Sequence, residues 1–584
     1  MVFLTVVSVV FIFAETKNFV VLQTSDLHGN IFPVDYASGN YSNVGLGKLA
    51  QLIMNEKKSN DTLLIDSGDL IQGTPLEYYH ARIENDPEDP MMKVMNYLGY
   101  DVGLVGNHEF NYGPEILNKA IAEAEFPVLG ANIVFKGTDI PYFKAYEIFE
   151  KDGIKIAVLG LTTKYIPNWE DAKNIADFEF LDPVETAGKY IPELRAEADI
   201  LIVSYHGGFE KDLKTGQPTE ELTGENQGYE ILTKFPEIDI MLTGHQHRTI
   251  SEMFGDTAVV QPSNWGKYLS KITVTLDNQS GKWKITGKKP ELIPVDSSVK
   301  EDKTVLSMVQ DYEDKVQKWL DIPVGKSEGD FYVYDPLETR MKDNALIEFV
   351  NRVQMKYTGA DISSTALFSD SVKGWKSGEI TLRDINGVYI YANTLKVIEV
   401  TGQDIKDAIE RTATYFTYKN KEIEVNDSWI NPKPQQYNYD MWEGIDYVID
   451  PENPEGQRVV GLYYKGKPLD MKEKYQIVLN NYRAGGGGNY NMFKGKPVVK
   501  EVMVEVSELM SDYILNVKNV NAETDKNWFV GLKDTYKVEK GDTLYKIASK
   551  YGIKTYEIAG WNNIKNENVL KTGEILTIYK PYVK

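Results

Sequence analysis

The first half of the chain alternates short apolar runs with polar stretches of helical periodicity. A polar, glycine-containing turn follows each run. Alternation of this kind predicts a layered α/β domain over residues 19–295. The runs that predict its strands are residues 19–22, 62–65, 102–105, 154–159, 199–203 and 238–242, with further strands at 259–260 and 271–276.

A change of pattern near residue 296 predicts a domain boundary. Residues 296–325 are rich in charge, and their central part, 300–320, contains neither glycine nor proline. We expect a linker helix there. A second α/β domain is expected over residues 326–530. Its predicted strands are residues 380–391, 396–400, 447–450 and 476–480.

The chain begins with an apolar run of about 14 residues. Such a run is short for a membrane span and typical of the apolar centre of a signal peptide. We therefore expect a signal peptide over residues 1–18; its basic first part is missing, which suggests a start further upstream. The alternative is a buried first strand, but residues 19–22 already supply one. No other long apolar run exists, so we expect no stable membrane span in the mature chain.

Length and composition narrow the class of protein. A chain of 584 residues exceeds one core and implies about three domains. Its net charge of −22 argues against nucleic-acid polymers as partners, because phosphate backbones require lysine and arginine surfaces. Single nucleotides stay open as substrates, since a metal can supply positive charge locally. The absence of cysteine excludes thiolate metal sites, cysteine nucleophiles and disulfides.

The placement of histidine is the main signal for chemistry. Five of the six histidines fall in four short motifs, and each motif follows a predicted strand. These motifs are Asp26-Leu-His28, Gly106-Asn107-His108-Glu109, Ser204-Tyr-His206 and Gly244-His245-Gln-His247. A fifth motif, Asp66-Ser-Gly-Asp69, follows another strand. The remaining histidine, His80, has no such context and receives no role.

Strand-end motifs of this kind predict a metal centre. Ligands of open α/β sheets bind beyond the carboxyl ends of the strands, so we expect these side chains to converge on one point. Imidazole suits zinc or iron, while carboxylate and amide oxygens suit harder ions such as manganese. Six or seven ligands exceed one tetrahedral site and fit two metals that share a carboxylate. We therefore expect two divalent ions, drawn from Zn, Mn, Fe and Co.

The order of these motifs resembles the calcineurin-like metallophosphoesterase superfamily, and within it the exported bacterial 5′-nucleotidase and 2′,3′-cyclic-nucleotide 2′-phosphodiesterase family. The resemblance covers about residues 19–530. It implies a four-layer α/β-β/α domain, a second α/β domain that binds the nucleotide, and hydrolysis of nucleotide phosphoesters. It also implies that Asp26, His28 and His247 hold one metal, that Asn107, His206 and His245 hold the other, that Asp69 bridges them, and that His108 is the catalytic histidine.

Two positions at which this chain differs from many 5′-nucleotidases bear on the choice of substrate. Many 5′-nucleotidases carry Asp where Asn111 stands, and the cyclic phosphodiesterases resemble this chain in carrying Asn, which would orient His108. Residues 367–378 correspond to a segment that ends in a phosphate-binding Arg in 5′-nucleotidases, and they contain no Arg. Both favour a 2′,3′-cyclic phosphodiesterase with 3′-nucleotidase activity that scavenges extracellular nucleotides. The alternatives are a 5′-nucleotidase or UDP-sugar hydrolase, and an inactive wall-binding protein.

Two segments of the second domain resemble the base-stacking segments of this family. They are residues 437–444 and 485–490, and the resemblance implies that Tyr439 and Tyr490 enclose the base. Stacking on aromatic rings contributes about 1–3 kcal/mol per base. Trp442 is an alternative to Tyr439, and ordinary packing is the alternative for both tyrosines.

The last fifty residues form a module of different charge. From Thr535 onward there are nine lysines and five acidic residues, a net charge of +4, so the rest of the chain carries −26. Residues 535–553, 561–563 and 570–578 together resemble a LysM domain, expected over residues 535–580 with strand-helix-helix-strand order. The resemblance implies binding to glycans such as peptidoglycan. We therefore expect a secreted protein of a bacterial cell wall or envelope.

Overall fold

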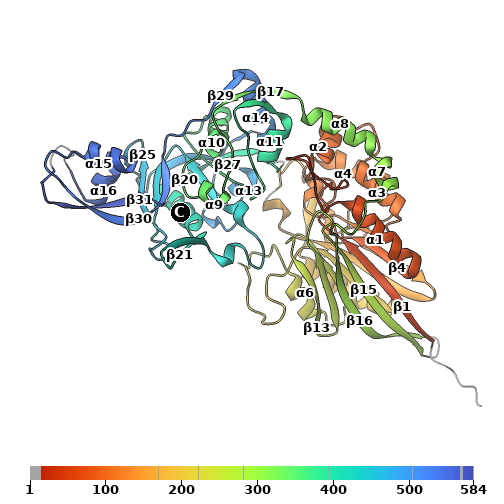
Figure 1. Ribbon diagram of the computed structural model, residues 1–584. Coiled ribbons are helices and arrows are strands. Elements are labelled where there is room, and N and C mark those ends of the chain that lie inside the picture. The colour runs from red at the N-terminus through yellow and green to blue at the C-terminus, as the bar shows by residue number, and fades with distance from the viewer. Residues whose placement is uncertain are drawn as a thin grey trace, which may run out of the picture.

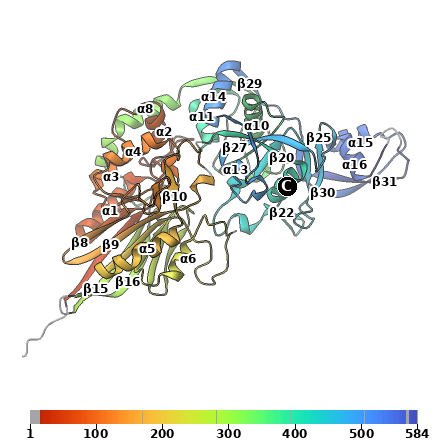
Figure 2. The ribbon, with the colours of Figure 1, turned by 180° about the vertical axis from the view of Figure 1, so that it is seen from behind.

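The computed structural model describes residues 15–168, 170–220, 222–279, 282–391, 393–502, 504–565 and 570–582. Its three parts follow one another along the chain and lie in a row (Figures 1 and 2). Of the expected signal peptide, residues 1–14 lie outside the described residues and residues 15–18 belong to the first strand. Among the helices described, none combines the length and apolar character needed to cross a membrane.

Two sheets pack face to face in the first part, with strand orders β16-β15-β1-β4 and β13-β14-β12-β11-β9-β8. Their strands are β1 (Glu15–Thr24), β4 (Asp61–Asp66), β8 (Tyr146–Lys151), β9 (Ile154–Thr162), β11 (Ile200–His206), β12 (Ile240–Thr243), β13 (Thr249–Phe254), β14 (Thr257–Pro262), β15 (Tyr268–Gln279) and β16 (Lys282–Pro294). β1 is parallel to β4, and β9, β11, β12 and β14 are parallel to one another. In each sheet the carboxyl ends of the parallel strands therefore share one edge.

Alternation of side chains along the strands explains the layers. Val21 of β1 faces the core between the two sheets, together with Ile202 of β11. Its neighbour Val20 faces the opposite side and packs with one group of helices, while Val203 of β11 packs with another. The first group includes α1 (Leu46–Ser59), α3 (Pro90–Leu98) and α8 (Gln310–Leu320), and the second α5 (Pro183–Glu197) and α6 (Gly228–Lys234). The four-layer α/β-β/α arrangement is thus confirmed.

The segment expected as a linker helix contains two helices, α7 (Lys303–Met308) and α8, which meet at Val309. Val305, Val316 and Leu320 are buried in the same core as α1 and α3. α8 also packs against α2 (Pro75–Arg82). These helices therefore cover the first sheet before the chain enters the second part.

A five-stranded sheet forms the centre of the second part, in the order β23-β18-β27-β20-β28. Its strands are β18 (Ile362–Ala366), β20 (Leu395–Thr401), β23 (Asp440–Glu443), β27 (Lys474–Asn480) and β28 (Val498–Val502). α10 (Ala345–Thr358) packs on β18, and α12 (Gly402–Ala413) packs on β20. The strands predicted at 396–400 and 476–480 are therefore present as β20 and β27.

The strand predicted over residues 380–391 is wrong. Within this range only Ile380 and Thr381 belong to a strand, β19 (Gly378–Thr381), and α11 (Leu382–Val388) follows it directly. Thr381 and Asp384 form a capping box in which each side chain bonds the other's backbone N–H. This local helix start overrides the β propensity of the Ile, Val and Tyr residues in the segment.

One long strand joins the second part to the tail. β30 (Trp528–Lys537) pairs first with β24 (Asp446–Ile449), and from Gly531 onward with β31 (Ile575–Pro581). With β25 (Val459–Tyr464) and β26 (Lys467–Pro468) these strands form one sheet that belongs to both parts. Between β30 and β31 lie α15 (Leu544–Tyr551) and α16 (Thr555–Trp561), so the expected βααβ order is confirmed. The tail is thus packed onto the second domain at the far end of the molecule (Figure 1).

Candidate metal centre and active site

The sequence motifs meet where the parallel strands end. Asp26 and His28 follow β1, Asp69 follows β4, His206 ends β11, and the segment with His245 and His247 follows β12. The loops are joined to one another: the N–H of Asp26 donates to Gly68 O over 2.9 Å. The N–H of His28 donates to Asp69 O over 2.9 Å, and the N–H of His245 to Asp26 Oδ1 over 3.0 Å. The strand ends therefore form one connected unit.

Left-handed backbone conformation is concentrated in these loops. Asp26, His28, Asp69, His245 and His247 have φ values of 53°, 49°, 61°, 66° and 54°. A residue with a side chain rarely adopts such a conformation, which costs roughly 1–3 kcal/mol unless the surroundings impose it. The fold thus stabilises a strained backbone at the points where the candidate ligands project.

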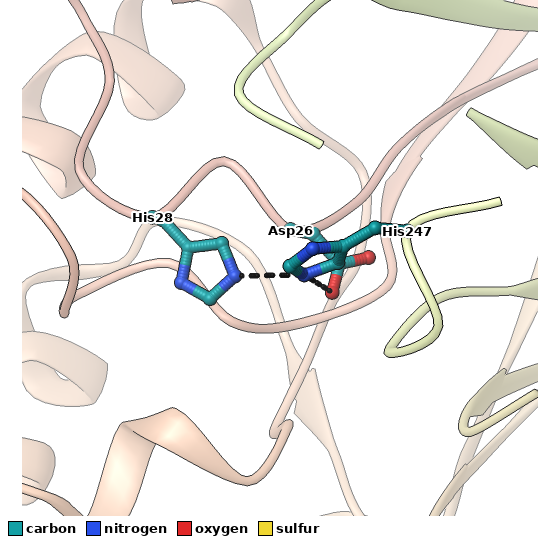
Figure 3. Close-up of side chains that lie close together, drawn as sticks. All are labelled: Asp26, His28 and His247. Atoms are coloured by element: carbon teal, nitrogen blue, oxygen red, sulfur yellow. Dashed lines mark hydrogen bonds and ion pairs between the residues drawn. The ribbon is translucent and has the colours of Figure 1, made fainter. Parts of the chain in front are cut away.

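Asp26, His28 and His247 form the first cluster of ligand atoms. Nε2 of His28 lies 3.2 Å from Nε2 of His247, which lies 3.3 Å from Asp26 Oδ1 (Figure 3). Nδ1 of His28 is 3.0 Å from Gln72 O, which can only accept a hydrogen bond. That contact places the ring hydrogen on Nδ1 and turns the lone pair of Nε2 toward His247. Two nitrogens and a carboxylate oxygen so close together fit a divalent cation.

The second cluster contains Asp69, His206 and His245, with Asn107 beside them. Nε2 of His206 lies 3.1 Å from Asp69 Oδ2 and 3.2 Å from Asn107 Oδ1. Nδ1 of His206 donates to Ser67 O over 2.6 Å, so Nε2 faces the cluster. His245 approaches the same amide, with Nδ1 at 2.8 Å from Asn107 Oδ1. This donor set of nitrogens and oxygens also fits a divalent cation.

Asp69 lies between the two clusters. Its Oδ2 is 3.1 Å from His206 Nε2 in one cluster and 3.9 Å from His28 Nε2 in the other. Its Oδ1 accepts the backbone N–H of His108 over 2.8 Å. A single carboxylate thus faces both groups of ligands, as a bridging ligand must.

The charges in the centre depend on one another. Burial raises the pKa of Asp26, but the hydrogen bond and charge of His247 outweigh it and hold that pKa at about 2. Burial lowers the pKa of His28 to about 3, so this imidazole is neutral. Burial lowers the pKa of His206, whereas the charge of Asp69 and their hydrogen bond raise it to about 10. Without a metal, a proton on His206 balances Asp69, and a divalent cation between the same atoms would replace it.

His108 lies beside the first cluster, with its ring centre 5.1 Å from that of His28. Nδ1 of His108 is 2.7 Å from Oδ1 of Asn111, whose amide nitrogen donates to Glu170 Oε2 over 2.6 Å. The structure therefore brings His108 and Asn111 together. Glu170 completes a chain of three side chains, and no sequence motif identifies it.

Two other residues of the site carried no role in the sequence interpretation. The carboxylate of Glu109 accepts the backbone N–H groups of Gly106 (2.6 Å) and Asp69 (3.0 Å), so it ties two motif loops together. Oε1 of Glu225 is 2.9 Å from Nε2 of His245. Glu109 follows His108 directly, whereas Glu225 lies in a long loop that offers no signal in the sequence.

The two tyrosines expected to enclose the base are fully buried. The hydroxyl of Tyr439 donates to Arg340 O over 2.6 Å. The hydroxyl of Tyr490 donates to Asn438 O over 2.9 Å, and its ring stacks on Phe493. In this conformation both rings are part of the core of the second domain and do not line an open slot; Trp442, the alternative, is buried there too.

Family models match three successive segments of the chain. The calcineurin-like phosphoesterase model matches residues 19–249, and the model of the 5′-nucleotidase C-terminal domain matches residues 323–495. The LysM domain model matches residues 536–578. The expected family of each of the three parts is thereby confirmed.

Several named proteins are similar to this chain. A 2′,3′-cyclic-nucleotide 2′-phosphodiesterase/3′-nucleotidase of Salmonella typhimurium is 31% identical over 81% of this chain and 82% of its own length. A trifunctional nucleotide phosphoesterase protein of Bacillus subtilis is 30% identical over 87% of this chain, which spans only 38% of that relative. The crystal structure of a putative 5′-nucleotidase from Staphylococcus aureus is 37% identical, with a TM-score of 0.81 over 88% of this chain and 100% of that one.

Proposed function

Because the chain belongs to the calcineurin-like phosphoesterases that carry a 5′-nucleotidase C-terminal domain, we propose that it hydrolyses nucleotide phosphoesters, chiefly 2′,3′-cyclic nucleotides and 3′-nucleotides. The observation that carries this proposal is the meeting of seven candidate ligands at the strand ends. Asp69 lies between two groups, one containing His28 and the other His206. An arrangement of this kind suits two divalent cations that act on one phosphate.

The ligand roles follow the two clusters. We assign the first metal to Asp26, His28 and His247, the second to Asn107, His206 and His245, and the bridge to Asp69. When bound, two divalent cations supply a polarising charge for the phosphoryl oxygens and activate water as the nucleophile. The protein holds the ligand atoms in place through the hydrogen bonds of His28 and His206 to backbone carbonyls.

His108 is assigned the role of the catalytic histidine. Its Nδ1–H donates to Asn111, so Nε2 is the ring nitrogen left to carry or release a proton. Nε2 would stabilise the charge that develops on the phosphate, or protonate the leaving oxygen. Asn111 orients the ring without placing a negative charge directly beside it.

The cyclic substrate is favoured over 5′-monophosphates by two lines of support. The Salmonella relative is named for cyclic and 3′-nucleotides. Residues 367–378 contain no Arg, and Arg340, which bonds Asp370 and Leu367 O of this segment, is fully buried. The second candidate is a 5′-nucleotidase, favoured by the similarity to the putative 5′-nucleotidase of Staphylococcus aureus.

We also propose that Tyr439 and Tyr490 stack on the base, on the condition that both rings can move. Both rings are fully buried, so stacking requires them to leave their present hydrogen bonds. The expected gain of about 1–3 kcal/mol per stacked base would have to exceed the cost of that movement. Tyr490→Ala should therefore raise KM more than it lowers kcat.

We also propose that the LysM domain holds the enzyme on peptidoglycan at the cell wall or envelope of a bacterium. The tail is at one end of the molecule, and the catalytic part is at the other (Figure 1). Binding through the tail would leave the metal centre open to soluble nucleotides.

An activity panel tests the proposed function. The purified chain, loaded in turn with Mn²⁺, Co²⁺ and Zn²⁺, is assayed on 2′,3′-cyclic AMP, 3′-AMP, 5′-AMP and UDP-glucose. We expect the highest kcat/KM on the cyclic substrate, with 3′-AMP next. A higher kcat/KM on 5′-AMP would favour the second candidate, and activity no greater than that of Asp69→Ala on every substrate would refute phosphoesterase function.

A further inference from the structure

The carboxylate of Glu225 is bonded to one imidazole of the second cluster. Its Oε1 lies 2.9 Å from Nε2 of His245. Because a carboxylate accepts hydrogen bonds, this contact places the ring hydrogen on Nε2. The lone pair of Nδ1 is then directed toward Asn107, whose Oδ1 is 2.8 Å away. Glu225 thus selects the tautomer in which His245 can offer Nδ1 to a metal.

The loop that carries Glu225 is anchored next to His206. The backbone carbonyl of Glu225 accepts the hydroxyl of Thr163 over 2.7 Å. The following residue, Asn226, accepts the N–H of Gly208 over 2.6 Å and donates to Glu220 over 2.8 Å. Glu220 in turn accepts from Gln246, the residue between the two histidines of the motif after β12, over 3.0 Å. The loop therefore braces the segment that carries His245 and His247 from two sides.

We infer that Glu225 is a positioning residue for the second metal, acting through His245. The inference rests on the proposed function, because it requires the two-metal centre. Affinity for the second metal should then depend on Glu225, while affinity for the first should not.

Metal binding in the absence of substrate tests the role of Glu225. Full-length metal-free enzyme is titrated with Mn²⁺ by calorimetry, and Co²⁺ absorption reports imidazole coordination. Glu225→Gln should weaken one of two Mn²⁺ sites by about 10- to 100-fold and leave the other unchanged. Glu225→Ala should weaken the same site at least as much. Glu230→Gln is the matched control, because its side chain forms an ion pair with Lys234 on an exposed face, away from the two clusters.

Unchanged Mn²⁺ affinity in both Glu225 variants would overturn the inference. A wild-type chain that binds fewer than two Mn²⁺ would refute the proposed function, and the inference with it.

Discussion

Oδ1 of Asn111 accepts a hydrogen bond of 2.7 Å from Nδ1 of His108. The amide nitrogen of the same side chain donates to Glu170 over 2.6 Å. Burial raises the pKa of Glu170, although hydrogen bonds from Asn174, Asp171 and Asn111 lower it in part. The neutral amide therefore separates His108 from a carboxylate, and the side chain at position 111 sets the charge next to His108.

Asn111→Asp should move the pH dependence of the reaction. A carboxylate beside the imidazole favours its protonated form, so the limb of the kcat/KM profile governed by His108 should move about one unit to higher pH. The ratio of 5′-monophosphatase to cyclic-phosphodiesterase activity should rise. The variant Glu170→Gln, measured in the same way, shows how much the more distant carboxylate contributes to the pH dependence. An unchanged profile and ratio would mean that Asn111 does not set the state of His108.

Asp69→Ala and His108→Ala should both lower activity, but for different reasons. Loss of Asp69 removes the carboxylate that faces both clusters, so metal content and activity should both be lost. Loss of His108 should lower kcat by about 10²- to 10⁴-fold with metal content unchanged, because its ring contacts the cluster without being assigned as a ligand. Elemental analysis alongside kinetics checks both. Wild-type metal content in Asp69→Ala would contradict the bridging role.

Removal of the metals should abolish activity and lower thermal stability. A metal that binds only the folded state adds about 2.7 kcal/mol at a free concentration one hundred times its Kd. Chelation should therefore lower Tm, and readdition of Mn²⁺ or Co²⁺ should restore Tm and activity together. Activity that survives exhaustive chelation would contradict a metal-dependent reaction. The pair of measurements also separates metal loss from irreversible unfolding.

Truncation at Lys533 should abolish cosedimentation with purified peptidoglycan and also destabilise the second domain. The cut divides β30 and removes the helices that bury Val448 and Phe529. Each such side chain contributes about 1.5–3 kcal/mol when buried, and each kcal/mol lost lowers Tm by about 2–4 °C. Hydrolysis at room temperature should persist, since all candidate ligands precede residue 248.

Two measurements decide this prediction. If the truncated chain pelleted with peptidoglycan as well as the full chain does, the tail would not be the anchor. An unchanged Tm would mean that the shared sheet adds no stability to the second domain. The full chain at roughly 0.5 M salt is a useful comparison, because the net positive tail should bind less well when charges are screened.

The second domain should lose stability as pH rises. Burial, with the charges of neighbouring acids, raises the pKa of Glu348 and of Glu443 to about 8, and that of Asp343 to about 6. The folded state thus keeps protons that the unfolded chain has released, so the free energy of unfolding falls between the unfolded and folded pKa values. Tm should decrease from about pH 5 to about pH 9. Glu443→Gln should make the decrease of Tm with pH less steep, whereas Glu455→Gln, at an exposed position, should not. Equal slopes of Tm against pH in the two variants would contradict the prediction.

One local strand prediction failed for an identifiable reason. Residues 380–391 are apolar and β-branched enough to predict a strand, but the capping box of Thr381 and Asp384 begins a helix. Base stacking by Tyr439 and Tyr490 stays a prediction, because the sequence pattern does not show that their hydroxyls bond inside the core. At Thr381 a few specific hydrogen bonds outweigh a pattern read along the chain.

The sequence by itself determined the parallel strands of the first domain and the order in which the candidate ligands follow them. Strand-end motifs such as Asp26-Leu-His28 and His245-Gln-His247 can be recognised in the sequence. The carboxyl ends of parallel strands lie at one edge of a sheet, so the motifs are expected to meet there whatever conformation the loops adopt. Only the tertiary structure decided which nitrogen of His206 faces the centre, and that Glu225 and Glu170 stand behind His245 and Asn111. It also decided that β30 is shared between two domains. These features depend on contacts between residues far apart in the chain, and no local periodicity encodes such contacts.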